Sequence, residues 1–261
     1  MNIIVCAKQV VDVAEIKVDS STKKPILAGV PQKISDMDKN ALEEAIKIKE
    51  KLGGKITVLT VGAPDAKERM KELLAMGADE AIRLTDPAFK ESDGLATAKI
   101  LAEAIRKLPY DLILTGTQTE DDGYGQVGVV LAELLGVPHA SLVTRLEIQE
   151  KKVKVHRELE GGLEEVVEID LPALLTIQTG INEPRYVSIM GIRKVAKKEI
   201  KTFGVSDLNL KAEEVGLAGS DIRLEKIFLP PVGEGAEMLE GKPEEVARKV
   251  VDILKDKGGV A

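Results

Sequence analysis

The chain has 261 residues, of which 44% are hydrophobic and only 2% aromatic, so its core must be built from Val, Leu, Ile and Ala. The net charge of −7 argues against nucleic acids and anionic membranes as partners, because phosphate surfaces require clustered Lys and Arg. A single cysteine, Cys6, excludes a disulfide framework and a thiolate metal site. No apolar run approaches the roughly 20 residues of a membrane span, and the N-terminus has no signal pattern, so we expect a soluble, cytoplasmic protein.

Short apolar runs alternate with helical patterns through the first half of the chain. Their unbroken apolar character predicts strands buried on both faces, at residues 2–7, 55–61, 80–85 and 111–115. Helices are predicted between and after these strands, at about residues 39–52, 65–76, 93–108 and 127–135. Such alternation requires right-handed crossovers and predicts an α/β fold, in which helices cover both faces of a parallel sheet. A small excursion strand is predicted at residues 15–19.

The pattern changes after about residue 141. Antiparallel additions to the sheet are predicted from strand-like segments at residues 142–148, 152–158, 164–169 and 173–178, with a hairpin turn at Gly161-Gly162. Beyond residue 198 the alternation stops, although residues 222–228 have strand character and residues 244–254 form an amphipathic helix. We therefore predict an α/β domain over residues 1–199 and a C-terminal arm over residues 200–261 that packs on a partner.

Residues 110–136 combine a short apolar strand, a polar loop and a helix closed by Gly136. This arrangement presents backbone N–H groups and a positive dipole end to a phosphate. Gly123, Gly125 and Gly128 formally match the GxGxxG dinucleotide motif, but they follow the fourth strand rather than the first, and six residues separate Gly116 from Gly123. An ordinary NAD site is therefore disfavoured, whereas close approach of some phosphate to the loop backbone is predicted.

Carboxylates in the loop and the single cysteine are further candidates for ligand contacts. Asp121 and Asp122 lack a nearby His and a third carboxylate at a convincing spacing, so capping of a helix start or binding of a ribose hydroxyl is favoured over a metal site. Glu120 is expected to be solvated. Cys6 ends the first strand, at the edge where parallel sheets bind ligands, although a small buried thiol is the simpler interpretation. We find no nucleophile set, and no side chain is nominated as a catalytic acid or base.

Several motifs together resemble the beta subunit of electron transfer flavoproteins. They are VHRELEGGLEEVVEIDLPALLTI at residues 155–177, NEPRY at 182–186, GADE at 77–80 and AKQVVD at 7–12. The resemblance extends over essentially the whole chain. It implies a Rossmann-like, adenine-nucleotide alpha-hydrolase-like fold, a heterodimer with a larger alpha subunit, and a C-terminal arm that embraces this partner.

The resemblance also implies a nucleotide site, carried over here by position. Contacts are expected from the ends of predicted strands and the loops after them, at Cys6, Ser35, Asp36, Met37, Asp38, Val61, Gly116, Thr117, Gln118, Thr119, Asp121, Asp122, Gly123, Tyr124, Gly125, Gln126 and Val127. Ile189 corresponds to the tip of a recognition loop that enters dehydrogenase partners, with a helix-start core residue as the alternative. Many family members have Asn-Pro where this chain has Ser35-Asp36.

The bound nucleotide distinguishes two types of family member. Gln126-Val127-Gly128 resembles the electron-bifurcating, FixA-like type, in which a second FAD takes hydride from NADH. The two electrons of this reduced FAD then follow different paths. One goes to a low-potential, ferredoxin-type acceptor, and the other goes through the alpha-subunit FAD to a dehydrogenase or quinone oxidoreductase. The alternative is a non-bifurcating subunit that holds a structural AMP. A third hypothesis, from the fold pattern alone, is a free-standing nucleotide-binding regulator or adenylating enzyme.

Overall fold

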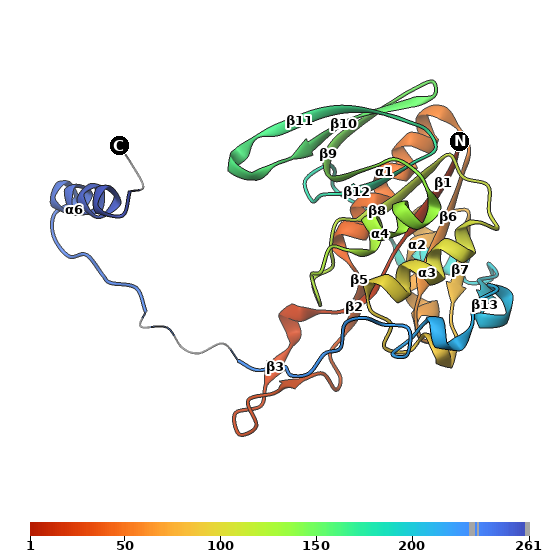
Figure 1. Ribbon diagram of the computed structural model, residues 1–261, viewed down its shortest axis with the longest axis horizontal. Helices are drawn as coiled ribbons and strands as arrows, with labels where there is room; N and C mark the ends of the chain where they lie inside the picture. Colours follow the sequence, from red (N-terminus) through yellow and green to blue (C-terminus); the bar gives the residue numbers. More distant parts are fainter. Residues whose placement is uncertain (230–232, 234, 259–261) are drawn as a thin grey trace.

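A computed structural model describes residues 1–229, 233 and 235–258 (Figure 1). Its centre is a nine-stranded sheet in the order β11 (Glu164–Asp170), β10 (Lys152–Glu158), β9 (His139–Gln149), β12 (Ala173–Ile177), β8 (Leu112–Gly116), β1 (Asn2–Cys6), β6 (Lys55–Val61), β7 (Glu80–Leu84) and β13 (Lys201–Phe203). The strands from β9 to β13 in this order pair in parallel, and β10 and β11 add an antiparallel extension. The predicted parallel sheet is confirmed, and so is an antiparallel extension, at β10 and β11. The antiparallel pairing predicted for residues 173–178 is wrong, because β12 runs parallel to both of its neighbours, β8 and β9.

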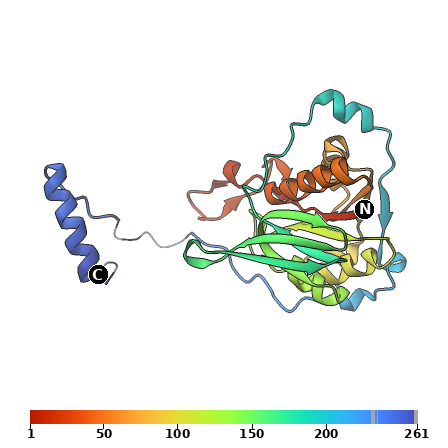
Figure 2. The same cartoon turned by 90° about the horizontal axis from the view of Figure 1, so that it is seen from above.

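Helices cover both faces of the sheet, as predicted. Figure 2 shows α1 (Asp36–Leu52) and α5 (Ile189–Val195) on one side of the sheet and α3 (Gly94–Ile105) and α4 (Val127–Leu135) on the other. The helix α2 (Ala66–Met76) lies on the α1 side, where its apolar residues join the same core cluster.

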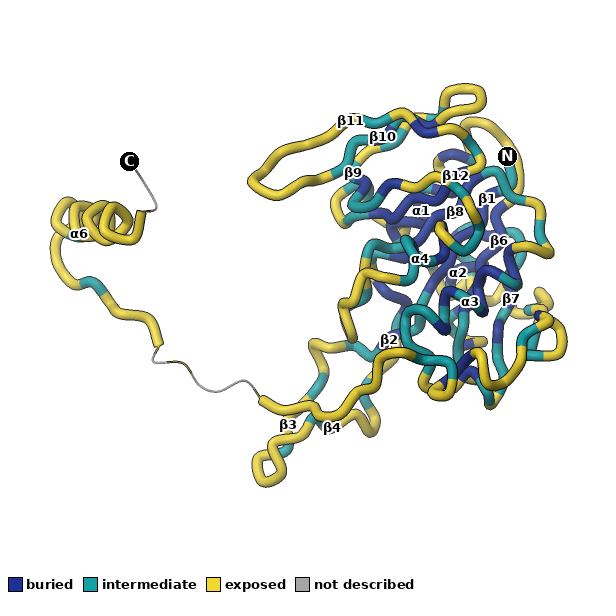
Figure 3. Tube along the Cα trace, viewed as in Figure 1, coloured by how far each residue is buried: buried dark blue, intermediate teal, exposed yellow. Residues whose placement is uncertain are grey.

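Two aliphatic cores result, one on each face of the sheet, and Figure 3 shows them as the buried centre of the molecule. Side chains alternate along each strand, so Ile3 and Val5 of β1 enter one core whereas Ile4 and Cys6 enter the other. Continuous apolar sequence in β1 is therefore required by burial on both faces.

A two-stranded excursion follows β1. The strand β2 (Gln9–Val11) pairs with β5 (Gln32–Ile34), and β3 (Lys17–Val18) pairs with β4 (Pro25–Ile26) beyond it. Residues 13–15, part of which were predicted as strand, form the 3-10 turn η1 (Val13–Glu15), because the Asp12 side chain accepts the N–H of Ala14 and closes the turn. The predicted excursion strand is therefore shorter, and it projects from the body in Figure 1.

The C-terminal residues form two different stretches. Residues 201–221 pack on the body. The strand β13 extends the sheet, and two 3-10 turns follow it, η4 (Val205–Asp207) and η5 (Ala212–Glu214). Leu208 and Val215, which directly follow these turns, are buried in the core. The strand character of residues 222–228 does not lead to a strand, because no strand among the described residues pairs with this segment. The last helix, α6 (Pro243–Asp256), is confirmed and stands away from the body in Figures 1 and 2.

Two further 3-10 turns complete the described elements, η2 (Pro87–Phe89) and η3 (Glu160–Gly162). The second contains Gly161 and is the hairpin turn predicted between β10 and β11. No helix in the described part of the chain has the length and apolar character required to cross a membrane.

Candidate nucleotide-binding site

The carboxyl ends of β1, β6 and β8 lie at one edge of the sheet. Strand order reverses between β1 and β8, because the chain passes from β1 to β6 and β7 on one side and returns to β8 on the other. Parallel sheets bind ligands in the crevice at such a reversal. The predicted contacts Cys6, residues 35–38, Val61 and residues 116–127 lie at the ends of these strands or in the segments that follow them, so the fold brings these segments to one region.

Asp38, in the first turn of α1, links two of these strand ends. Its carboxylate is 5% exposed and accepts the backbone N–H groups of Lys8, after β1, and Gly116, at the end of β8, both at 2.8 Å. A Cβ on Gly116 would lie 2.6 Å from Asp38 Oδ1, so only glycine allows this approach. The helix begins at Asp36 rather than near residue 39, which places Asp38 within hydrogen-bond reach of both strands.

Burial dominates the titration of Asp38. Desolvation raises its pKa from 3.8 to about 7, and the charge of Glu120 adds to the rise, whereas the two N–H donors and Lys8 oppose it. Because the folded-state pKa is raised, the folded protein binds a proton more tightly than the unfolded chain. The contribution of this group to stability is therefore complete below the unfolded pKa and is lost as pH rises through about 7.

The substitution Asp38→Asn tests this sign. The amide does not titrate, and its Nδ2 cannot accept one of the two backbone N–H groups that Asp38 binds. The variant is therefore expected to be less stable than the wild type at pH 4.5. This difference in the free energy of unfolding is expected to shrink as pH rises to 7.5. Urea unfolding of both proteins followed by circular dichroism measures it. Parallel pH profiles for the two proteins would contradict a raised pKa at Asp38.

Lys8 contributes a cation that the sequence prediction did not include. Its Nζ lies 3.0 Å from Asp121 Oδ2 and 2.7 Å from Asp122 Oδ2. Burial lowers the pKa of Lys8, but the hydrogen bonds and charges of Asp122 and Asp121 outweigh it and hold this pKa above its usual value. The ammonium group therefore stays charged and offsets part of the negative charge that a phosphate would meet.

The two aspartates do not cap α4, which corrects one sequence-based expectation. The N-cap residue Gln126 has no side-chain cap hydrogen bond, and Asp121 Oδ1 instead accepts the N–H of Asp122 at 2.9 Å and the hydroxyl of Thr119 at 2.6 Å. Within the described ranges, no three His, Cys, Asp or Glu side chains are grouped to hold a metal ion. Binding of a ribose hydroxyl therefore stays the prediction for these carboxylates.

Glu120 is also not the solvated residue that the sequence suggested. Its Oε1 accepts the backbone N–H of Asp36 at 2.7 Å, and its Oε2 is buried with no hydrogen-bond partner among the described residues. Lys33 Nζ lies 3.7 Å from Glu120 Oε1. The glutamate thus ties the loop after β8 to the start of α1.

Glycines give the loop its shape. Gly123 and Gly125 have φ values of +63° and +62°, a left-handed backbone that other residues adopt only with strain. Gly128 is required for a different reason, because a Cβ there would lie 2.6 Å from Thr176 Cγ2 and 2.8 Å from Thr115 Oγ1. Gly123 and Gly125 therefore serve the turn, and Gly128 serves close packing of α4 on the sheet.

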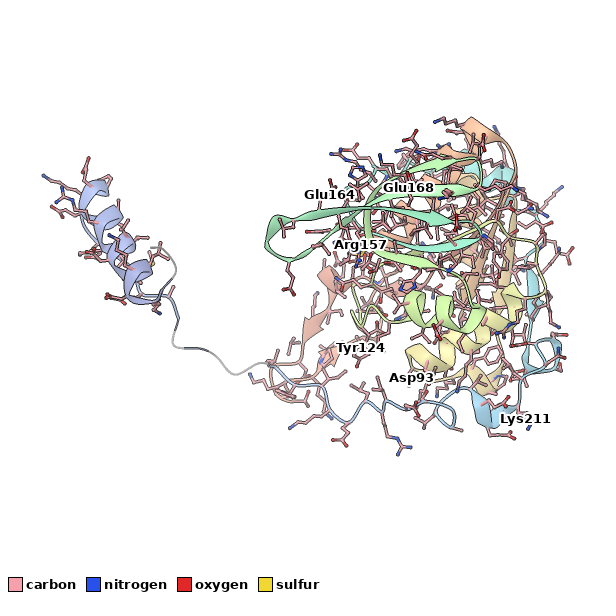
Figure 4. All side chains as sticks on the ribbon, turned by 45° about the horizontal axis from the view of Figure 1, so that its top comes forward. Asp93, Tyr124, Arg157, Glu164, Glu168 and Lys211 are labelled. Carbon is pink, nitrogen blue, oxygen red and sulfur yellow. The ribbon has the colours of Figure 1, made fainter. Side chains whose placement is uncertain are left out.

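The N-terminus of α4 has uncapped backbone N–H groups. Its backbone hydrogen bonds begin with Val130, whose N–H donates to the Gln126 carbonyl at 3.1 Å, so the first N–H groups of the helix have no intrahelical acceptor. With no side-chain cap on Gln126, these groups and the positive dipole end face the loop. Gly94 of α3 lies close by, since a Cβ on it would lie 3.2 Å from Gln126 Oε1, and Figure 4 shows Tyr124 and Asp93 on the same side of the molecule.

Polar atoms without partners lie at the same edge. The hydroxyls of Ser35, before α1, and Thr60, near the end of β6, are buried with no hydrogen-bond partner among the described residues. Buried hydroxyls normally find a partner. These two atoms, together with the free N–H groups of α4, fit a ligand rich in hydrogen-bonding groups such as an adenine nucleotide.

Cys6 is buried, and burial followed by the charge of Asp38 raises the pKa of its thiol well above the usual range. A neutral thiol is a poor nucleophile, so the simpler interpretation, a small buried side chain, describes Cys6 in this structure. Val61 ends β6 and is partly buried against the same core. Both therefore supply apolar surface rather than chemistry.

Ile189 lies apart from this site, at the first position of α5 and 69% exposed. The alternative interpretation, a core residue at a helix start, is therefore wrong. The hydroxyl of Ser188 caps the helix by accepting the N–H of Gly191 at 3.0 Å. The role of Ile189 as a partner-binding residue stays a prediction.

Comparison with known proteins relates most of the chain to electron transfer flavoproteins. The model of the electron transfer flavoprotein domain matches residues 24–208. The chain is 43% identical to the electron transfer flavoprotein subunit beta of Thermoanaerobacterium thermosaccharolyticum, over 98% of this chain and 99% of that protein. It is 42% identical to the caffeyl-CoA reductase-Etf complex subunit CarD of Acetobacterium woodii, over 98% and 99%. It is 38% identical to the protein FixA of Azotobacter vinelandii, over 92% and 88%.

Proposed function

Because this chain belongs to the electron transfer flavoprotein family, as a beta subunit, we propose that it holds FAD at the edge formed by β1, β6 and β8. Beta subunits of this family act with an alpha subunit. The observation that carries the proposal is the junction at Asp38, where one buried carboxylate joins two strand ends beside an uncapped helix N-terminus.

Different parts of the site bind the phosphates, the ribose and the adenine ring of the nucleotide. The first N–H groups of α4 and the backbone around Gly123 and Gly125 bind the phosphates. The carboxylates of Asp121 and Asp122 accept from ribose hydroxyls, and Lys8 between them limits repulsion of the phosphates. Apolar surface at the ends of β1 and β6 covers the adenine ring.

Two observations favour FAD over AMP. Gln126-Val127-Gly128 matches the pattern of the bifurcating type, and high-coverage relatives carry the names FixA and caffeyl-CoA reductase-Etf complex subunit CarD. A flavin held here would supply hydride acceptance from NADH and release of electrons one at a time. The chain's own residues bind and orient this group and set its surroundings, and the described part of the site contains no side chain that we assign to proton transfer.

The alternative function is a non-bifurcating subunit with AMP at the same site. The names of other relatives, such as that of Bacillus subtilis at 37% identity over the full length, specify only an electron transfer flavoprotein subunit beta and are compatible with either nucleotide. Family membership leaves the third hypothesis, a free-standing regulator or adenylating enzyme, without support.

The proposal includes the partners expected from the sequence. The C-terminal arm binds the alpha subunit, for which α6 offers the exposed apolar residues Val250, Val251, Ile253 and Leu254. Ile189 contacts a dehydrogenase or quinone oxidoreductase, and a ferredoxin-type protein takes the low-potential electron. We place the complex in the cytoplasm, where NADH is available.

Anaerobic titration with NADH tests the proposed reaction. The chain is co-expressed with its alpha subunit, and the purified heterodimer is mixed with NADH in the absence of any dehydrogenase. Bleaching of flavin absorbance by NADH is the expected result. A heterodimer with AMP at this site, the alternative function, is not expected to be bleached by NADH. A flavin that NADH leaves oxidised, although dithionite reduces it, would overturn the proposal and favour the alternative.

A further inference from the structure

The segment between β12 and α5 is attached to α1 by side chains rather than by secondary structure. Residues 181–187 form no helix or strand. Asn182 Nδ2 donates to the Asn40 carbonyl at 3.0 Å and to Glu44 Oε2 at 2.9 Å, and Asn40 Nδ2 donates back to Asn182 Oδ1 at 3.0 Å. This reciprocal amide pair fixes the start of the segment on the second turn of α1.

Arg185 makes a second and stronger attachment. Its Nε and one terminal nitrogen donate to the two oxygens of Glu43, each at 2.9 Å, and its backbone N–H donates to Glu43 Oε2 at 3.1 Å. The other terminal nitrogen donates to Glu50 at 2.9 Å. Bidentate pairing of this kind fixes orientation as well as distance. Hydrogen bonds to Glu43 and then Glu50 raise the pKa of Arg185, so the guanidinium stays charged.

Glu43 is only 4% exposed, although it is a glutamate in the middle of a helix. A buried carboxylate is retained where a partner satisfies it, and this one has three hydrogen bonds from one residue. Apart from the packing of Ile181 and Val187 on the core, the described hydrogen bonds from residues 181–187 to α1 all come from Asn182 and Arg185. The pair Glu43–Arg185 is therefore the charged part of the attachment between this segment and α1.

Exposed apolar side chains follow this attachment directly. Tyr186 is 90% exposed, Ile189 69% and Met190 62%. Large apolar side chains gathered on the surface mark a protein-binding site. Docking of such an anchor is tighter when its backbone is ordered before binding, because the entropy of ordering is not lost at the encounter.

We propose that Glu43 and Arg185 are positioning residues for partner docking, which hold Tyr186, Ile189 and Met190 in a fixed orientation towards an apolar pocket of a redox partner. The same helix carries Asp38 into the nucleotide site, five residues and about 7.5 Å along the axis from Glu43. One rigid helix thus sets both the cofactor and the docking segment. This proposal rests on the proposed function, because it takes Ile189 as the partner contact.

The test compares Glu43→Gln with Glu50→Gln in the intact heterodimer. Electron transfer is measured to the dehydrogenase partner, which must dock, and to ferricyanide, which need not. Glu43→Gln is expected to raise the KM for the dehydrogenase about tenfold, with ferricyanide reduction and cofactor content unchanged. Glu50→Gln removes only the solvent-exposed second partner of Arg185 and is expected to behave as the wild type.

Two further measurements separate the possible failures. Ile189→Ala tests the docking contact itself, so a normal KM in this variant means that the partner-binding part of the proposed function is wrong. A raised KM in Ile189→Ala together with a normal KM in Glu43→Gln overturns the positioning proposal alone. Hydrogen exchange of residues 181–190 is expected to quicken in Glu43→Gln and in Arg185→Lys. Unchanged exchange in both variants also overturns it.

Discussion

Gly125→Glu is expected to empty the beta-subunit cofactor site while the fold survives. The glutamate carboxylate would lie in the loop before α4, where it competes with the phosphates for the free N–H groups of the helix. It also repels any phosphate that enters, by about 4 kcal/mol for unit charges 4 Å apart near a protein surface, which corresponds to roughly a thousandfold in affinity. Cofactor released from the purified heterodimer by denaturation measures the occupancy.

Gly125→Gln is the matched control. Both variants place a side chain at φ +62°, and both meet the same neighbour, since a Cβ there would lie 3.4 Å from the Thr117 carbonyl oxygen. Each therefore has the same backbone strain, about 1–2 kcal/mol. Greater loss in the Glu variant isolates the effect of charge. Full occupancy in Gly125→Glu would mean that the phosphates lie elsewhere.

Gly128→Ala is expected to displace α4 from the sheet. The added methyl group would lie 2.6 Å from Thr176 Cγ2 and 2.8 Å from Thr115 Oγ1, closer than atoms in folded proteins approach. Overpacking of this kind lowers the free energy of unfolding by about 1–3 kcal/mol. The movement also carries the N-terminus of α4 out of line with the loop, so affinity for the cofactor is expected to fall with stability.

Thr176→Ser supplies the rescue. It removes the methyl group that the new Cβ would meet and retains the hydroxyl that accepts the N–H of Leu142 at 3.2 Å. The double variant with Gly128→Ala is expected to recover part of the lost stability, as measured by thermal unfolding. Strictly additive effects of the two substitutions would show that the clash is not at Thr176.

Local patterns were sufficient for most of the fold. Uninterrupted apolar strands such as 55–61 and amphipathic helices follow from hydrophobic periodicity, and the motifs at 155–177 and 182–186 were sufficient to identify the family, which the relatives confirm. The failures lie where distant contacts override local signals. Leu208 and Val215 lie in a stretch with no regular apolar period, and their burial follows only from the core that they enter.

The details of the site depend on contacts between residues far apart in sequence. Asp38 meets Gly116 across 78 positions, and Glu43 meets Arg185 across 142. One sequence signal was available for each missed residue. Lys8 comes two residues after the first strand, at the edge where ligands bind. Glu43 borders the apolar stripe of a helix, where a carboxylate needs a partner.

The central claim is that the site at the ends of β1, β6 and β8 holds a second FAD beside that of the alpha subunit. Quantitative extraction of nucleotides from the purified heterodimer, separated by chromatography and calibrated against protein concentration, tests it most directly. Two FAD and no AMP per heterodimer is the result that this account predicts. One FAD together with one AMP would contradict it.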